Sequence, residues 1–187
     1  MVFSEYELKQ MGVKIAGSEE YIAADCVGSC EEEMEVKVVN KSCRGVVVKT
    51  RVRGTGKGTL NISMHCPKEI YDAAYGMELD SLIEGVKAYG QNSVHKTFSI
   101  TQLVEDEDGN VKYKAYPNCI IMSGKKGTIE NGAEEVAEIE MEVSVMPDDF
   151  GNGVYEALAL ELDDEVKEEW MTAFTPTLVQ KAINGPV

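Results

Sequence analysis

The sequence predicts a mainly β fold, a β-sandwich or partly open barrel of about seven to nine short strands with one short flanking helix and a C-terminal helix. Three observations support this fold class. Several segments alternate apolar and polar residues with a period of two, most clearly residues 135–146. Glycine-rich turns separate these segments, and only residues 68–75 and 163–174 have helical spacing. We expect one domain at residues 21–174, an N-terminal arm at 1–20 and a C-terminal tail at 175–187.

The strongest strand signal lies in residues 135–146, which read EVAEIEMEVSVM. Its apolar residues point to one side and its glutamates to the other, because successive strand side chains project to opposite faces. A helical period would spread the same apolar residues around the whole circumference. The polar face is either an ordinary solvated sheet face or a surface kept negative because something negative passes along it. The glutamates on this face are Glu138, Glu140 and Glu142.

The first third of the chain contains several expected strands. Residues 1–20 have weak periodicity, which is why we assign them to an arm. We expect short strands at residues 21–27 and 34–40, the second following an acidic turn at 31–33. Two longer strands are expected at residues 44–53 and 57–66, joined by the glycine-rich turn at 54–58.

The rest of the chain begins with a short helix. Pro67 suits its first turn, Gly76 suits a left-handed stop, and residues 77–93 then form a loop or a loop with one strand at 86–89. Strands at residues 94–104 and 111–122 are joined by the favoured hairpin turn Asp108-Gly109. A polar loop at 124–132, the strand at 135–146 and a strand at 155–162 precede the last helix. In this helix Val166, Trp170, Ala173 and Phe174 would share one face.

The net charge of −15 is unevenly distributed along the chain. Residues 1–100 carry 14 acidic and 12 basic side chains, whereas residues 101–187 carry 19 acidic and 6 basic ones. Because phosphate contacts supply much of the affinity for nucleic acids, this excess of carboxylates excludes a conventional nucleic-acid binder for the second half.

Cysteine use and hydropathy favour a chain made in a cytoplasm. The five cysteines are odd in number, and the first ten residues, MVFSEYELKQ, lack the cationic start and apolar run of a signal peptide. We therefore expect reduced thiols. No apolar segment approaches the roughly 18 residues that a membrane span needs.

None of the candidate chemical motifs has the context that its chemistry requires. The run RGTGKG is followed by an expected strand, whereas phosphate-binding glycine loops lead into a helix. The acidic run before Gly109 does not match a calcium loop, and Cys26 with Cys30 lacks a second matched pair for zinc. His65 and His95 have no nucleophile placed by a known motif. We expect no catalytic residue, no metal and no cofactor.

The first half of the chain has one further candidate feature, a cluster of cationic side chains. No acidic residue occurs between Lys37 and Lys68. The cluster is either a solvated edge whose charge discourages aggregation, or a docking surface for an acidic partner such as the second half of this same protein. Its members are Lys41, Arg44, Lys49, Arg51, Arg53 and Lys57.

Three segments give the chain a resemblance to the siphophage major tail protein, the tail-tube subunit of phages and prophages of Gram-positive bacteria. They cover about half of the chain and match in pattern and order. They read CRGVVVKTRVRGTGKGTLNISMHCPKEIYDAAYGM (43–77), VKAYGQNSVHKTFS (86–99) and AYPNCIIMSGKKGTIENGAEEVAEIEMEVSVMPDDFGNGVYEA (115–157).

The resemblance implies a structural virion protein of the tail, made in the host cytoplasm, that stacks as hexameric rings into a tube for DNA ejection. It implies tape measure, tail terminator and distal tail proteins as partners, and double-stranded DNA that passes without specific binding. A lumen-facing position of Glu138, Glu140 and Glu142 and an inter-subunit position of the basic hairpin are our hypotheses within this picture.

Three other classes of protein remain open. Tube proteins of contractile injection or type VI-like systems look similar in fold, so fold alone does not separate these machines. A β-sandwich adhesion module would be a monomer in the culture medium, and a small acidic enzyme or metal protein would retain a stoichiometric metal. Neither of these last two accounts for the opposed charges of the two halves of the chain.

Overall fold

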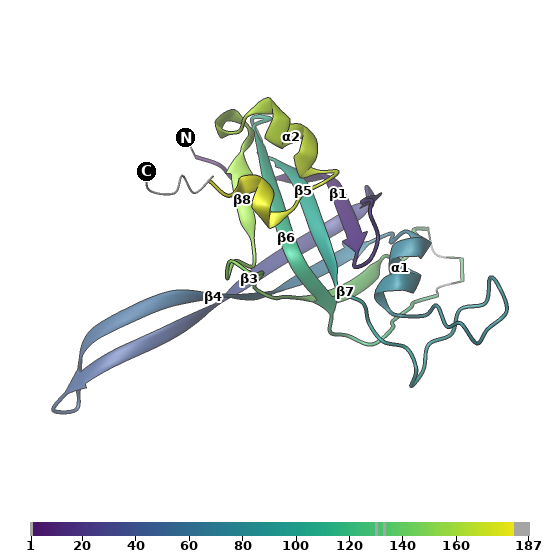
Figure 1. Cartoon of the computed structure of the whole chain (residues 1–187), viewed down its shortest axis with the longest axis horizontal. Coiled ribbons are helices and arrows are strands. Elements are labelled where there is room, and N and C mark those ends of the chain that lie inside the picture. The colour runs from purple at the N-terminus through teal and green to yellow at the C-terminus, as the bar shows by residue number, and fades with distance from the viewer. Residues whose placement is uncertain (1, 130, 133, 182–187) are drawn as a thin grey trace, which may run out of the picture.

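The computed structural model describes residues 2–129, 131, 132 and 134–181. These residues form one antiparallel sheet of eight strands, two α-helices and two short 3₁₀ helices (Figure 1). The strands are β1 (Glu7–Ile15), β2 (Ile22–Ala23), β3 (Val27–Cys43), β4 (Val46–Met64), β5 (Phe98–Glu105), β6 (Val111–Ile121), β7 (Ile139–Val145) and β8 (Tyr155–Leu158). The helices are α1 (Lys68–Ala74), α2 (Asp164–Trp170), η1 (Ala159–Glu161) and η2 (Pro176–Val179).

The sheet has the order β2-β1-β5-β6-β7-β4-β3, and it curls so that one of its faces becomes an interior. Strand β8 lies off this path and pairs with β6: Lys112 to Ala115 of β6 pair with β8, and Cys119 to Ile121 of β6 pair with β7. Contacts between distant strands show the curl, because the Gln102 amide of β5 donates to Cys30 Sγ of β3 at 3.3 Å. The sheet does not close, so the fold is a partly open barrel. The predicted mainly β class, with a flanking and a C-terminal helix, is confirmed.

The interior holds the main hydrophobic core. Alternate residues of each strand point into it, as the two-residue period of a strand requires. The strand predicted at residues 135–146 is confirmed for residues 139–145, where Met141, Val143 and Val145 are buried. It is wrong for residues 135–138, which precede the strand and include the exposed Ala137. The other buried residues on the core strands include Met11, Val13, Ile15, Leu60, Ile62, Met64, Ile100 and Tyr116.

Helix α1 covers one end of this core with Ile70 and Ala74. It starts after Pro67, whose missing N–H would have no helical partner there, and it ends before Gly76. Gly76 has a φ of +62°, and a Cβ on it would collide with the Val94 carbonyl. The predicted helix and its glycine stop are therefore confirmed.

Helix α2 builds a second, smaller core on the outer face of the sheet. Trp170 and Phe174 are buried against Ala115 of β6, and the Trp170 indole N–H donates to the Lys114 carbonyl at 3.1 Å. The predicted face is confirmed for Trp170, Phe174 and the partly buried Val166. It is wrong for Ala173, which is exposed because α2 ends at Trp170.

The arm predicted at residues 1–20 is wrong for its middle part, because Glu7–Ile15 form β1 within the sheet. The outer half of β1 is polar, so its apolar alternation is limited to the short series Met11, Val13 and Ile15. Residues 86–89 are loop rather than strand, and residues 176–179 form η2 within the expected tail. Residues 182–187 of that tail lie outside the described part of the chain.

The turns predicted at residues 31–33 and 54–58 are also wrong. Both segments lie inside long strands, and the hairpin turns instead at Arg44 and Gly45, with φ values of 51° and 79°. This pair of left-handed residues suits a tight β-hairpin turn. The glycine-rich run is a β-bulge, because Met34 pairs with Gly58 while Val36 pairs with Gly54.

Replacing Gly76 with alanine should lower the free energy of unfolding by more than about 1 kcal/mol, because the new Cβ meets both backbone strain and the Val94 carbonyl. Gly109 is the matched control, since its φ is +80° but no neighbouring atom lies within 4 Å of the position that a Cβ would take there. Urea unfolding of both variants measures the difference. Equal losses would contradict the close packing assigned to Gly76.

Candidate functional site

Residues 36–54 form a projecting hairpin, in which β3 and β4 continue beyond the core (Figure 1). Every one of these residues is exposed. At about 3.3 Å per residue, the eight residues 36–43 span roughly 25 Å. A two-stranded ribbon is marginally stable in water by itself, so we expect this segment to pack against the surface of a partner.

One face of the projecting hairpin is basic. Lys49, Arg51 and Arg53 lie on the same side of β4, and Lys37 and Lys41 of β3 join them across the ribbon. Lys37 lies opposite Arg53 and Lys41 lies opposite Lys49. Like charges directly opposite each other destabilise a strand pair.

The basic face has no acidic partner among the described residues of its own chain. Among the described residues, no ion pair involves a cation of the projecting hairpin. Of the cations predicted to cluster there, Arg44 lies in the turn at the tip, whereas Lys57 lies in the bulge at the base. The predicted cluster is therefore brought together except for Lys57.

The opposite side of the projecting hairpin is a valine face. Val38 pairs with Val52, Val36 pairs with Gly54 and Val47 pairs with Ser42. These four valines are between 52% and 59% exposed, so the face is an uncovered apolar strip. Sequence reasoning missed this face, although the alternation of Val36 and Val38 with lysine was its signal.

The base of the projecting hairpin is held by close backbone packing. A Cβ on Gly56 would lie 2.6 Å from the Gly151 carbonyl oxygen, and one on Gly153 would collide with the Gly56 carbonyl. The loop that carries Gly151 and Gly153 is fixed by Asp148, whose carboxylate accepts hydrogen bonds from the backbone N–H groups of Phe150 and Asn152 at 2.9 and 3.0 Å. Gly56 thus lets this loop approach the bulge.

A second surface is the outer side of the β3-β4-β7 part of the sheet. Glu140 and Glu142 of β7 pair with Ser63 and Asn61 of β4, and Glu31 of β3 pairs with Asn61 from the other side. With Glu33 and Glu138, these carboxylates form what we call the acidic sheet face: Glu31, Glu33, Glu138, Glu140 and Glu142.

Two details of the acidic sheet face differ from the sequence analysis. Glu138 precedes β7, and its carboxylate accepts a hydrogen bond from the Ser63 hydroxyl at 2.6 Å. Glu31 and Glu33 were missed because their segment resembled a turn. Lys126 lines the same groove as Glu140 and Glu142, so one cation does accompany them.

The open seam of the barrel contains a cluster of buried charge around Lys114, whose side chain is only 5% exposed. Its ammonium group lies 2.6 Å from Glu32 and 3.3 Å from both Glu5 and Glu156. Burial would lower the pKa of Lys114, but the hydrogen bond and the charges of these carboxylates hold that pKa above its ordinary value. Glu32 also accepts a hydrogen bond from the Tyr116 hydroxyl. The cluster ties the N-terminal segment and β8 to β3 and β6.

Two further titratable residues, His95 and Asp106, have structural partners. His95 Nδ1 lies 2.8 Å from the Ile121 carbonyl oxygen, and its Nε2 lies 3.1 Å from the Tyr89 hydroxyl. Asp106 accepts hydrogen bonds from the backbone of Asp108 and Asn110 within its own turn. All five cysteines are free, and the described residues contain no group of three or more His, Cys, Asp or Glu side chains that could hold a metal ion.

No helix in the described part of the chain is long and apolar enough to cross a membrane.

Stability should fall as the pH drops below about 4.5, and Glu5→Gln should make that fall smaller. Burial raises the pKa of Glu5, but Lys112 and Lys114 lower it overall, so its contribution is present above the unfolded pKa and lost as pH falls through the folded pKa. Urea unfolding at a series of pH values between about 3 and 7 measures the slope. The exposed Glu19→Gln is the control. An unchanged slope in Glu5→Gln would show that Glu5 is not held by the lysines.

The chain matches no protein-family model and no curated protein sequence. It is similar to a chain in the cryo-EM structure of the anti-feeding prophage baseplate, with 9% identity and a TM-score of 0.47, over 87% of this chain and 100% of that chain. It is also similar to a chain in the structure of the anti-feeding prophage tube-terminating cap, with 10% identity and a TM-score of 0.44, over 85% and 96%. Both TM-scores are below 0.5, so this likeness carries no argument about function.

Proposed function

We propose that this protein is a structural, non-enzymatic subunit of a phage-type tail, which assembles with itself into stacked hexameric rings that conduct DNA. The observation that carries the proposal is the projecting hairpin, exposed on both faces and without an acidic partner among the described residues of its own chain. The resemblance of three sequence segments to siphophage major tail proteins supports the tube. Tape measure, tail terminator and distal tail proteins are the further partners that this role requires.

The energetics of the projecting hairpin favour a closed assembly over a simple pair. Burying its four half-exposed valines contributes roughly 1 kcal/mol each. Association costs about 4–15 kcal/mol in lost translational and rotational freedom, so one such contact is insufficient. In a ring each copy gives one hairpin and receives another, and closure of the ring adds a contact without a further association step.

The acidic sheet face is proposed to line the channel of the ring. A conduit for a polyanion works when its wall repels the cargo evenly, because cations would create binding sites that stall it. Five carboxylates with one neighbouring lysine meet this requirement. The proposal keeps the lumen-facing position that the sequence suggested for Glu138, Glu140 and Glu142. It extends this position to Glu31 and Glu33.

Wild-type protein should form rings or tubes in negative-stain micrographs, and removal of the projecting hairpin should leave a monomer. In the variant, a two-residue Asn-Gly turn replaces residues 36–54, which contribute nothing to either hydrophobic core. Light scattering over a concentration series measures the assembly, and thermal unfolding shows that the body still folds. A wild-type chain that stays monomeric at every concentration, also with partner tail proteins present, would contradict the proposal.

Replacing Glu138, Glu140 and Glu142 together with lysine should leave the fold intact, since exposed charges contribute little to stability. It should slow genome ejection from assembled particles, because each ring gains a band of phosphate-binding cations. Ejection is measured at low and high salt, with a triple glutamine variant as the control for lost negative charge. Unchanged ejection at low salt, where attraction is least screened, would place these residues away from the channel.

A further inference from the structure

The basic face of the projecting hairpin fits an anionic surface that also offers some apolar contact. Val39 lies between the cations, opposite Arg51, and is 53% exposed. The matching surface therefore needs several carboxylates and an exposed apolar side chain beside them. It must also be rigid, because ordering a flexible acidic loop would add an entropic cost.

The surface around α2 has these properties, and we call it the acidic helix surface. Only one cation, Lys167, lies within residues 160–169, and it already pairs with Asp164 at 2.8 Å. Leu160, at the edge of this surface, is 80% exposed. The buried Trp170 anchors the helix to the sheet and turns its acidic side outward. The exposed carboxylates are Glu161, Asp163, Asp164, Glu165, Glu168 and Glu169.

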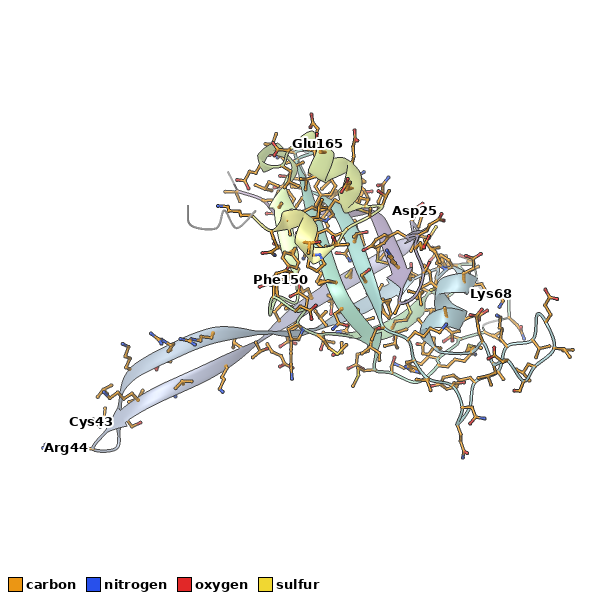
Figure 2. All side chains as sticks on the ribbon, in the orientation of Figure 1. Asp25, Cys43, Arg44, Lys68, Phe150 and Glu165 are labelled. Carbon is orange, nitrogen blue, oxygen red and sulfur yellow. The ribbon has the colours of Figure 1, made fainter. Side chains whose placement is uncertain are left out.

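The projecting hairpin does not reach this surface in its own chain. Figure 2 shows Arg44 at the tip, far from the body, and Glu165 on α2 above the body. Folding the hairpin back would disrupt the packing of Gly56 against Gly151 and Gly153 at its base. A contact between these two surfaces therefore joins different copies, and because the surfaces differ it is a head-to-tail contact that propagates into rings or helical stacks.

We propose that the basic face of the projecting hairpin docks on the acidic helix surface of a second copy of this chain. The inference rests on the proposed self-assembly and deepens it by naming the two surfaces that meet. The acidic sheet face is the competing acceptor, but the residues paired with its carboxylates on β4 include the polar Ser63 and Asn61, and Lys126 already lies beside it. The like-charged pairs of the projecting hairpin would each gain carboxylates on docking, which offsets their mutual repulsion.

Charge exchange tests this contact. Arg51→Glu with Arg53→Glu should raise the concentration of half-assembly about tenfold or more, as loss of opposed charges across an interface does. Glu165→Lys with Glu168→Lys should weaken assembly similarly, and the chain that carries all four changes should recover most of it. The matched control combines the changed hairpin with Glu140→Lys and Glu142→Lys, and no recovery is expected. Thermal unfolding of each variant confirms that the body is folded.

Each outcome decides a separate claim. If the variant with Arg51→Glu and Arg53→Glu assembles as the wild type does, this inference is overturned and the proposed function still stands. Recovery through the acidic sheet face instead of the acidic helix surface also overturns it. A wild-type chain that stays monomeric overturns the inference together with the proposed function. Titration of the protein with a fluorescent DNA duplex tests nucleic acid as the alternative partner of the basic face. DNA binding by the wild type that is lost with Arg51→Glu and Arg53→Glu would assign the basic face to nucleic acid and overturn the inference.

Discussion

The pairing of β3 with β4 along almost their entire length is the interaction on which the rest of the structure depends. In the body this pairing carries Leu60 and Ile62 into the core and sets Glu31 opposite Asn61. Beyond the bulge the same ladder continues without a core, so the projecting hairpin is a continuation of the sheet that is exposed on both faces. A bulge bends the strands locally, and Gly56 at this bulge leaves room for the loop that carries Gly151 and Gly153. The same pair of strands is therefore buried on one face in the body and exposed on both faces in the projecting hairpin.

Alternation along strands then sorts charge into separate regions. On β3, Glu32 points to the seam and pairs with Lys114, whereas Glu31 and Glu33 point outward. A buried lysine with three carboxylates is an arrangement that holds specific segments together, because removing a partner leaves an uncompensated buried charge. The outward carboxylates have no comparable role in the described part of the body. This division leaves the outer surface of the body strongly acidic, whereas the projecting hairpin carries cations and no carboxylate.

Sequence reasoning succeeded where local signals agree and failed where tertiary context decided. The alternation around Met141 and Val143, the helix stop at Gly76 and the turn at Gly109 are each specified by a few adjacent residues, and all three are confirmed. The bulge at residues 54–58 was missed because a glycine-rich run signals a turn unless a distant loop packs on it. Strand β1 was missed because its outer half is polar. The candidate surfaces were found only in part, since the register that brings Glu31 beside Asn61 and Glu142 is a long-range property.

The central claim is that the projecting hairpin is covered by another copy of the chain. Hydrogen exchange measured by mass spectrometry tests it most directly, by comparing the peptide that spans residues 36–54 in dilute monomer and in assembled particles. A ribbon that is exposed on both faces opens readily, whereas a docked ribbon opens only when the contact breaks. The account predicts strong slowing of exchange in this peptide on assembly, with slowing also in residues 159–170. Equal exchange of residues 36–54 in monomer and particle would contradict it.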